Sequence, residues 1–419
     1  MLSEFDEMSD TSLKKLSLNA YASIIGEEKT EEIRILAENL RSKHVCHVNS
    51  TSFGGGVAEI LQSIVPLMCD VGLKVEWKVI NGSYEFFNIT KNIHNGLQGM
   101  DVSLSEQMKR KYLENNKANA QELNLNHEFI VIHDYQPAAI ISYYPVKANK
   151  WIWRCHIDLS TPNMTFWKFL EPYIQLYDAA IFSMKKYVRP NFKMRKIAII
   201  PPSIDPLSEK NKEISESLML KTLEKYDVDP DKPIITQVAR FDPWKDPLGA
   251  IEVYRLIKRK MPDLQLLLIS SMAHDDPEGW LYYEKTVRHA GEDYDIHFLT
   301  DRVGVGGLEV NAFQRATNVA LQMSTREGFG LSVTEALWKR VPVVGRKAGG
   351  IPLQVIDGLT GFLVDDVKEA AEKTFYLLKH PEKAEEMGEK GRKHVVKNFL
   401  ITRHLKDYLK LFNELLKKT

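Results

Sequence analysis

The strongest constraint on the fold is an alternation of short apolar segments with helix-length segments, which runs along the chain and restarts near its midpoint. Apolar segments of strand length lie at residues 44–49, 73–77, 129–134, 151–158, 179–183 and 197–200. They resume at 234–239, 264–269, 296–299 and 319–321, followed by glycine-broken segments at 341–345 and 358–364. Strands that alternate with helices favour a parallel sheet. The sequence therefore predicts an α/β protein.

A proline-rich break, Pro201–Pro206, divides the chain into two predicted domains. The length of 419 residues suits two domains of roughly 200 residues each. Residues 1–43 are interpreted as an N-terminal extension with a helix over 31–40. The first domain is expected over 44–202, and the second over 203–399. The final segment, 402–416, carries an apolar stripe typical of an amphipathic helix.

Composition and charge exclude several classes of protein. Lys+Arg and Asp+Glu both total 56, so the zero net charge gives no support for nucleic acid as a partner. No apolar run has the length of a signal peptide or a membrane span, which predicts a cytoplasmic protein without membrane association. Cys46, Cys69 and Cys155 lack the spacing of a metal site or a disulfide framework, and we interpret them as buried thiols.

Three glycines, Gly54–Gly56, follow the first strand and open a helix that runs to Met68. Glycine lets a ligand approach the backbone closely, and a helix N-terminus favours an anion. The loop could also be a dinucleotide fingerprint, with Glu76 near the distance expected for a ribose-binding acid. Against this, Glu59 stands where that fingerprint has its third glycine. A tight turn before a packed helix is the remaining interpretation.

Polar residues follow two further strands of the first domain. His133 and Asp134 end the segment at 129–134, and His156 and Asp158 end the segment at 151–158. Open parallel sheets bind ligands beyond the carboxyl ends of their strands, so these side chains lie where chemistry is expected. A histidine in such a place is more often a hydrogen-bonded loop residue. We single out His156 as the candidate.

Two cations, Arg240 and Lys245, lie on the loop after the strand at 234–239. An arginine can bind a diphosphate in bidentate fashion, and a lysine can add a point charge. An exposed, solvated pair is the alternative. Because the loop follows a buried strand directly, we favour anion binding.

A pair of carboxylates, Glu327 and Glu335, flanks a glycine turn between a strand and a helix. The residues between them begin with Gly328-Phe329-Gly330-Leu331, and the helix is expected from Ser332. Such a turn directs free backbone N–H groups at a ligand. Alternatively, Ser332 to Glu335 fits a capping box, in which the glutamate is structural.

Taken in order, these features resemble the retaining nucleotide-sugar glycosyltransferases of the GT-B fold, family 4. The matching features are the glycine loop, Arg240 with Lys245, the Glu-x7-Glu pair, and the glycine turns at 349–350 and 358–361. Within that family, residues 50–59, 133–136 and 154–158 resemble the trehalose synthase and trehalose phosphorylase branch.

The resemblance implies two Rossmann-like parallel-sheet domains facing a central cleft. It also implies that the C-terminal helix, residues 400–419, crosses back to join an acceptor-side domain of residues 44–202. The domain at 203–399 would bind the nucleotide sugar. Synthases of this branch transfer glucose from a nucleoside-diphosphate glucose, such as ADP-glucose or UDP-glucose, to glucose, giving trehalose and NDP reversibly. No cofactor or metal is then expected, because cationic side chains can neutralise the diphosphate.

The resemblance further implies roles for individual residues. Arg240 and Lys245 would neutralise the leaving diphosphate. His156 would lie by the transferred glucose, either donating to a hydroxyl or stabilising positive character near the anomeric carbon. Glu327 would bind the donor glucose. The other expected substrate-binding residues are Gly55 and Gly56, the backbone of Gly328, Phe329, Gly330 and Leu331, Glu335 for the ribose, and His133 and Asp134 as weaker candidates for the acceptor.

Retaining hydrolases place two carboxyl groups about 5 Å apart, one of them a nucleophile. Glu327 and Glu335 are instead assigned to hydroxyl binding, so we expect front-face displacement, in which the departing phosphate oxygen takes the proton of the acceptor. Three alternatives stay open: a retaining trehalose phosphorylase, a dinucleotide-dependent oxidoreductase and a non-catalytic sugar-nucleotide sensor. Amphipathic segments within residues 1–43 could support a homodimer.

Overall fold

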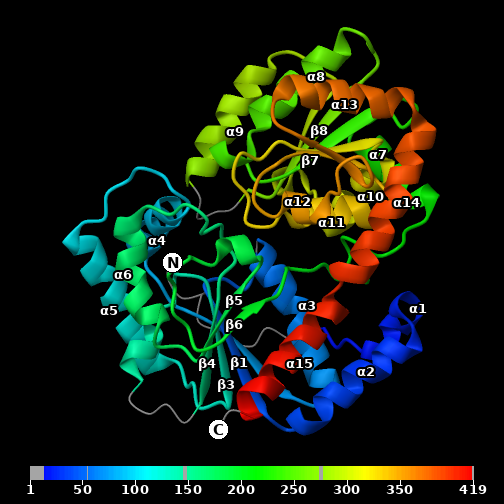
Figure 1. The fold of residues 1–419 in the computed structure, drawn as a ribbon. Helices are drawn as coiled ribbons and strands as arrows, with labels where there is room; N and C mark the ends of the chain where they lie inside the picture. The colour runs from blue at the N-terminus through cyan, green and yellow to red at the C-terminus, as the bar shows by residue number, and fades with distance from the viewer. Residues whose placement is uncertain (1–13, 54, 145–148, 273–276, 418–419) are drawn as a thin grey trace, which may run out of the picture. The chain divides into compact units, whose positions relative to one another are not determined.

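The computed structural model describes residues 14–53, 55–144, 149–272 and 277–417. The chain forms two compact units, which are coloured by residue number in Figure 1. Unit 1 comprises Met1–Pro202 with Ile401–Thr419, and unit 2 comprises Ser203–Leu400. Each unit is an α/β body with its own sheet, so the predicted fold class is confirmed.

Unit 1 contains a six-stranded sheet in which every pairing is parallel, with the order β2-β1-β3-β4-β5-β6. The strands are β1 (His44–Asn49), β2 (Lys74–Val79), β3 (Phe129–His133), β4 (Lys150–Arg154), β5 (Ala179–Phe182) and β6 (Ile197–Ile199). All residues of β3 and β5 are buried, as expected for inner strands of a sheet covered on both faces. The six strands expected in this half of the chain are all present.

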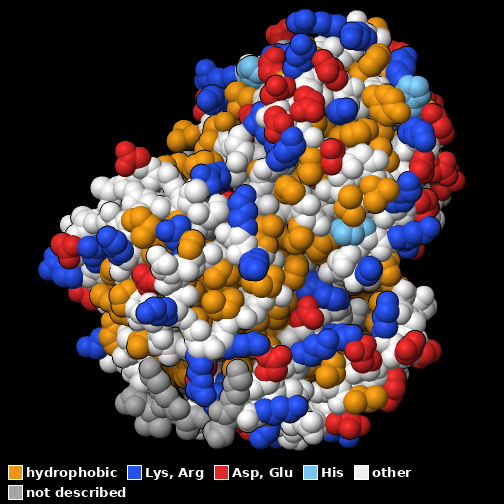
Figure 2. Space-filling model, in the orientation of Figure 1, with side chains coloured by type: hydrophobic (Ala, Val, Ile, Leu, Met, Phe, Trp, Pro, Cys, Tyr) orange, Lys and Arg blue, Asp and Glu red, His pale blue; other side chains and the backbone are white. Residues whose placement is uncertain are grey.

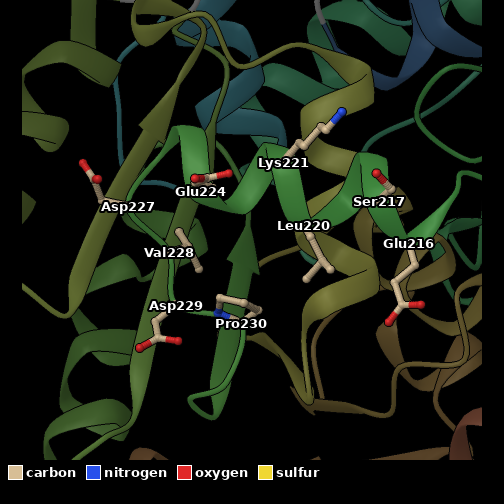
Figure 3. A pocket seen from close by; sticks show the side chains of 9 residues that line it. All are labelled: Glu216, Ser217, Leu220, Lys221, Glu224, Asp227, Val228, Asp229 and Pro230. Atoms are coloured by element: carbon tan, nitrogen blue, oxygen red, sulfur yellow. The ribbon is translucent and has the colours of Figure 1, made fainter.

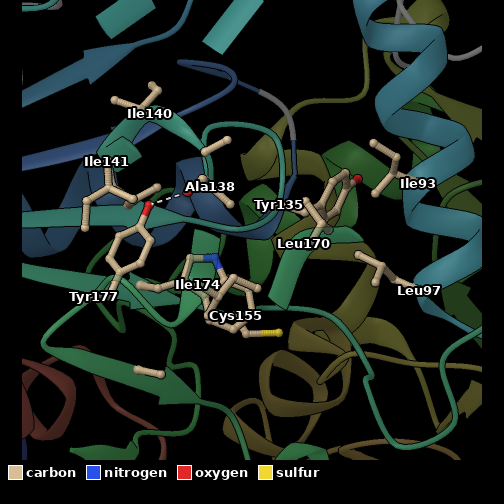
Figure 4. Packing of buried hydrophobic residues seen from close by; sticks show 14 of the residues in the cluster. Ile93, Leu97, Tyr135, Ala138, Ile140, Ile141, Cys155, Leu170, Ile174 and Tyr177 are labelled. Atoms are coloured by element: carbon tan, nitrogen blue, oxygen red, sulfur yellow. Dashed lines mark hydrogen bonds between the residues drawn. The ribbon is translucent and has the colours of Figure 1, made fainter. Parts of the chain in front are cut away.

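Helices cover the sheet of unit 1. They are α1 (Ala22–Ile25), α2 (Glu27–Ala37), α3 (Gly56–Asp70), α4 (Tyr84–Leu97), α5 (Glu106–Glu122), α6 (Met164–Ile174) and α15 (Ile401–Lys417). One apolar cluster of this unit is drawn in Figure 4, where Tyr177 donates to the carbonyl of Ala138 at 2.8 Å.

The C-terminal helix α15 lies against α2 and α3 in unit 1, as the red and blue ribbons of Figure 1 show. Its apolar stripe is buried, and the ring of Phe412 stacks on Phe129 of β3 with centroids 4.4 Å apart. Asn413 donates to the carbonyl of Leu36, which ties the helix to the N-terminal residues. The described residues before β1 therefore pack within unit 1, with Leu18 and Tyr21 buried.

Unit 2 repeats this architecture with a second six-stranded parallel sheet, in the order β12-β11-β10-β7-β8-β9. The strands are β7 (Ile234–Val238), β8 (Gln265–Ser270), β9 (Ile296–Thr300), β10 (Val319–Gln322), β11 (Val343–Arg346) and β12 (Gly361–Val364). The helices are α7 (Glu216–Lys225), α8 (Pro247–Lys258), α9 (Pro277–Ala290), α10 (Gly307–Ala316), α11 (Leu331–Trp338), α12 (Ile351–Gln354), α13 (Val367–Lys379) and α14 (Pro381–Asn398).

Two details differ from the sequence-based expectations. Cys46 and Cys155 are buried, but Cys69 is exposed near the end of α3, so its interpretation as a buried thiol was wrong. The helix expected from Ser332 begins one residue earlier, because Gly330 adopts a left-handed conformation and caps α11. No helix within the described ranges combines the length and apolar character needed to cross a membrane. Figure 2 shows acidic and basic side chains interspersed over the face in view.

Candidate active site

The first group of predicted site residues lies at the carboxyl ends of β7 and β10 in unit 2. Lys245 ends a short 3-10 turn, Pro243–Lys245, that follows β7, and Glu327 lies on the loop after β10. Lys245 Nζ donates to Glu327 Oε2 at 2.7 Å. Their side chains are only 16% and 8% exposed, so this ion pair is largely shielded from solvent.

Two further donors fix the Glu327 carboxylate. Gln322 Nε2 and Ser324 Oγ lie 3.2 and 3.1 Å from the same oxygen, Oε2, that accepts from Lys245. Gln322 is the last residue of β10, so the strand itself positions the carboxylate. Neither residue was identified from the sequence, although both lie within five residues of Glu327.

Arg240 and Lys245 are connected through Asp242, which the sequence analysis did not single out. Asp242 is buried, and its Oδ1 accepts from the backbone N–H of Lys245 at 3.0 Å. Its Oδ2 lies 3.3 Å from Arg240 Nη2, while the Arg240 side chain is 46% exposed. One carboxylate therefore holds both cationic residues on the same loop. The sequence Asp242-Pro243 could have indicated the helical turn, because Asp is favoured at an N-cap and Pro at the next position.

Glu335 occupies a separate, buried position on α11. Its Oε1 lies 3.5 Å from Lys210 Nζ, and its Oε2 accepts from Gln314 Nε2 at 3.4 Å. The capping-box alternative was wrong, because Gly330 is the N-cap and Ser332 donates instead to Gln322 Oε1 at 3.0 Å. Glu335 does not cap the helix, and its carboxylate faces side chains from other segments of unit 2.

A buried lysine, Lys339, lies one turn beyond Glu335 on the chain. Its Nζ donates to Asn211 Oδ1 at 2.9 Å and to the Glu335 carbonyl at 3.4 Å. Burial lowers the pKa of Lys339 from 10.5 to about 7. The neighbourhood of Glu335 thus holds two amines, those of Lys210 and Lys339. Neither lysine was predicted as a site residue. Lys210 is far from Glu335 in the sequence, Lys339 directly follows α11, and neither belongs to a motif.

The backbone of the glycine turn is fixed by α12. Gln354 Nε2 donates to the Phe329 carbonyl at 2.5 Å. A Cβ on Gly350 would lie only 2.8 Å from Phe329 Cα, so the absence of a side chain there is required for the close approach. The turn Gly328–Leu331 is therefore in contact with the glycine turn at 349–350, although the two turns belong to separate sequence motifs.

The second group of predicted site residues lies at the carboxyl ends of β3 and β4 in unit 1. His133 Nδ1 lies 2.9 Å from His156 Nε2, and His133 Nε2 lies 3.0 Å from Nδ1 of His47, on β1. Both His47 and His133 are buried, whereas His156 is partly exposed. His47 was not singled out from the sequence, because a histidine within an apolar strand carries no motif.

Asp134 anchors the backbone around His156. Its Oδ1 accepts from the His156 N–H at 2.7 Å, and its carbonyl accepts from Trp153 Nε1 at 2.8 Å. Burial raises the pKa of Asp134 to about 7. Asp158, further along the same loop, accepts from the N–H of Ser160. The aspartates therefore shape the loop that carries His156.

The glycine loop of unit 1 leaves open space before α3. Gly55 is the N-cap of this helix, and no heavy atom of the described residues lies within 4 Å of the place that a Cβ would occupy. Gly54 lies outside the described residues. Glu76 lies within β2, which continues beyond it to Val79, and its carboxylate lies 3.0 Å from Lys78 and 3.3 Å from His127.

A surface hollow in unit 2, drawn in Figure 3, lies apart from these residues. It is lined by α7 and the following loop, with the carboxylates of Glu216, Glu224, Asp227 and Asp229. This acidic lining is unsuited to a diphosphate. Among the residues that the structure describes, no group of three or more His, Cys, Asp or Glu side chains is arranged to hold a metal ion.

Comparison with known proteins gives the family context of both units. A family model described as "Trehalose synthase, N-terminal domain" matches residues 47–189, and one described as "Glycosyl transferases group 1" matches residues 220–394. The trehalose synthase of Thermococcus litoralis is 59% identical over 398 residues, which cover 94% of this chain and 96% of that protein. A trehalose phosphorylase of Pleurotus pulmonarius is 30% identical, covering 83% of this chain and 54% of that protein. The solved α,α-trehalose 6-phosphate synthase of Burkholderia multivorans shares the fold, with a TM-score of 0.70 at 15% identity and coverage of 90% and 100% of the two chains.

Proposed function

The chain belongs to the trehalose synthase family of GT-B glycosyltransferases, and from this premise we propose that it transfers glucose from a nucleoside-diphosphate glucose to free glucose. The products are trehalose and NDP, the reaction is reversible, and the configuration at the transferred anomeric carbon is retained. ADP-glucose and UDP-glucose are the candidate donors. The protein requires no cofactor or metal for this transfer.

The observation that carries the proposal is the buried Lys245–Glu327 pair at the ends of β7 and β10. It combines an ammonium group, suited to a phosphate, with a carboxylate, suited to sugar hydroxyls. Arg240 supplies a second cation from the same loop through their shared partner Asp242. Negative charge grows on a diphosphate as its bond to the sugar breaks, so preorganised cations lower the barrier.

The two carboxylates support front-face displacement. Glu327 Oε2 receives hydrogen bonds from Lys245, Gln322 and Ser324, and Glu335 is buried beside Lys210 and Gln314. Both are committed to binding rather than to attack on a carbon. In the proposed step the anomeric carbon–phosphate oxygen bond breaks while the bond to the acceptor oxygen forms on the same face. The departing phosphate oxygen takes the acceptor proton. A covalent glucosyl group trapped on Glu327 would contradict this mechanism.

A trehalose phosphorylase is the second candidate, because inorganic phosphate could occupy the same cations. The higher identity to a trehalose synthase, 59% against 30%, favours the synthase. The matches to trehalose synthase and to the group 1 glycosyl transferases favour a transferase over the oxidoreductase alternative.

A product assay tests the proposal. Purified protein is given ADP-glucose or UDP-glucose with glucose, and in parallel trehalose with NDP or with phosphate. We expect trehalose from the nucleotide sugar, and trehalose breakdown with NDP only. If trehalose is broken down with phosphate alone, the protein is a phosphorylase. If it binds the donor but gives no product in any of the reactions, it is a sugar-nucleotide sensor. Donor incubated without acceptor is the control for hydrolysis.

A further inference from the structure

Three histidines of unit 1 form a continuous hydrogen-bonded chain from the protein interior to a partly exposed end. His47 Nδ1 and His133 Nε2 are 3.0 Å apart, and His133 Nδ1 and His156 Nε2 are 2.9 Å apart. The rings of His133 and His156 are stacked, with centroids 5.2 Å apart and planes at 18°. Both nitrogens of His133 are therefore occupied by other imidazoles.

The connectivity links the three tautomers to one another. Each contact needs one N–H and one lone pair, and a neutral imidazole has one of each. If His47 carries its proton on Nδ1, His133 must accept at Nε2 and donate from Nδ1, and His156 must then accept at Nε2. The three protons therefore all lie on Nδ1 or all lie on Nε2. In the first pattern His156 presents an N–H at its remaining nitrogen, and in the second it presents a lone pair.

The buried end of the chain selects between these patterns. His47 Nε2 is buried and has no hydrogen-bond partner within the described part of the chain, and the same holds for Nε, Nη1 and Nη2 of Arg154. Arg154 is fully buried at the end of β4, and its charge acts on His47, His133 and His156. With the protons on Nε2, a buried N–H of His47 would have no acceptor near this cation, at a cost of about 1–3 kcal/mol. With the protons on Nδ1, His47 Nε2 carries a lone pair instead, which the positive charge of Arg154 favours.

We infer that His47 and His133 are positioning residues that hold His156 in its Nδ1–H tautomer, so that it donates a hydrogen bond to a hydroxyl of the transferred sugar. This inference rests on the proposed function, together with the place beside the transferred glucose that the family resemblance implies for His156. His156 then acts as a neutral hydrogen-bond donor, and not as a group that stabilises positive character near the anomeric carbon. Burial and the nearby Arg154 lower the pKa of His156 well below its usual value, which agrees with a neutral ring.

Further ionisable groups lie around the histidine chain. His404 and Tyr408 of α15 lie on the His47 side, with the Tyr408 ring centroid 5.8 Å from that of His47. Arg403 of the same helix is paired with Asp407 at 2.7 Å, and Asp134 binds the backbone of His156 rather than its ring. No carboxylate among the described residues forms an ion pair with any of the three imidazoles, so none is stabilised as an imidazolium.

Nitrogen NMR of the imidazoles tests the tautomer directly, without any assay of activity. The wild-type protein is labelled with ¹⁵N-histidine, and the His156 signals are assigned by their loss in His156→Gln. We expect a protonated Nδ1 and an unprotonated Nε2 at neutral pH, which is opposite to the tautomer that predominates for histidine in water. A protonated Nε2, or protonation of both nitrogens, would overturn the inference even if the transfer reaction is confirmed.

Kinetics of two variants at position 133 test the consequence for catalysis. His133→Asn keeps an N–H donor near the place of Nδ1, and His133→Leu has a similar size without any donor. We expect His133→Leu to lower kcat by about 10²-fold, with the KM for the donor changed little, because misplacement of a catalytic group costs on this order. His133→Asn should recover a large part of kcat. Equal losses in both variants would indicate a packing role only and overturn the inference.

His297→Leu is the matched control for these variants. His297 is a partly buried histidine of β9 in unit 2, outside both groups of site residues. It should leave kcat and the His156 signals unchanged. If His133→Leu leaves the His156 tautomer unchanged, the chain does not position that residue. If the wild-type protein shows the expected tautomer but no glucosyl transfer, the proposed function fails and the positioning contact stands.

Discussion

At the residue scale, the two cations predicted to bind the diphosphate have different surroundings. Lys245 is buried against Glu327, whereas the Arg240 side chain is 46% exposed. Removal of Lys245 leaves Glu327 buried without its cation, whereas removal of Arg240 leaves the buried Asp242 with the backbone N–H of Lys245 as a remaining donor. The two residues are therefore expected to affect stability differently even if both act on the same phosphate groups.

We predict that Arg240→Ala lowers kcat by about 10²-fold or more and lowers the free energy of unfolding by about 1–3 kcal/mol, because the buried Asp242 loses one of its partners. Steady-state kinetics and urea unfolding measure the two quantities. Arg288→Ala, which removes an exposed arginine paired with Glu284, is the control and should change neither. Unchanged turnover in Arg240→Ala would mean that the diphosphate binds elsewhere.

Lys245→Ala should lower turnover to a similar extent and also destabilise the protein by about 3–5 kcal/mol, because Glu327 would remain buried without its cation. Lys258→Ala breaks a more exposed pair with Asp295 at the far end of α8 and serves as the control for stability. A stable but inactive Lys245→Ala would show that Glu327 does not depend on this lysine for its charge balance.

Glu335→Gln tests a binding role without changing the size of the side chain. The carboxylate faces Lys210 and Gln314 rather than its own helix start, so loss of a cap is excluded as an explanation. We expect a rise of about tenfold in the donor KM, equivalent to roughly 1.4 kcal/mol of binding. Isothermal titration with NDP provides the direct check. Unchanged affinity would restrict Glu335 to a structural role.

Lys339 predicts how stability depends on pH. Its pKa is about 7 in the folded protein and 10.5 as an ordinary lysine, so between these values the unfolded chain binds a proton that the folded chain does not. The free energy of unfolding contributed by this site therefore rises as pH increases from about 7 toward 10. Urea unfolding at several pH values should show a smaller rise in Lys339→Met than in the wild type. Parallel profiles would contradict the lowered pKa.

At the element scale, the turn that carries Glu327 depends on its contact with α12. The N-cap of α11 and the carbonyl of Phe329 are held by backbone geometry and by Gln354 rather than by a side-chain cap. Sequence patterns identified both glycine turns, but not that they touch.

Gly350→Ala should therefore disturb the donor site through packing alone. The added Cβ would lie 2.8 Å from Phe329 Cα, closer than real Cβ atoms approach, so the turn must move. We expect a higher donor KM together with a loss of about 1–3 kcal/mol in stability. Gly307→Ala, whose Cβ would meet nothing closer than 3.5 Å, is the matched control on α10. Equal effects of the two variants would show that the contact is not specific.

At the scale of the whole molecule, unit 1 is built from two separate stretches of sequence. α15 covers β3 and packs on α2 and α3, and it buries Leu405, Tyr408, Leu409 and Phe412. Full burial of such side chains stabilises by about 1.5–3 kcal/mol each, comparable in sum with the stability of a whole domain.

Truncation after Leu400 should accordingly unfold unit 1 and leave unit 2, whose chain is then complete, able to unfold as its own transition. Scanning calorimetry and proteolysis of the two forms measure this. Truncation after Lys417 keeps α15 and is the control. A truncated chain that retains both transitions would show that unit 1 is stable without this helix.

Patterns in the amino-acid sequence were enough to predict the secondary-structure elements and their order. Hydrophobic periodicity, apolar runs and glycine turns located the twelve strands of the described residues to within a few positions. This succeeded because the inner strands of a parallel sheet are buried on both faces and appear in the sequence as continuous apolar segments. The same reasoning located Lys245 and Glu327, since polar residues after buried strands must lie at the edge of the sheet.

Contacts between side chains, in contrast, became visible only in the folded protein. Lys210 and His47 contact the predicted residues from positions with no motif, since hydrogen bonds depend on proximity in space and not on spacing in sequence. The Asp-Pro sequence at Asp242 indicated a helix start, but not its contact with Arg240. The capping box at Ser332 failed for the same reason: the left-handed Gly330 starts the helix earlier, which frees Ser332 to bind Gln322. The direction of the protons in the histidine chain is likewise inferred from Arg154, which the fold buries without a hydrogen-bond partner for its guanidinium among the described residues.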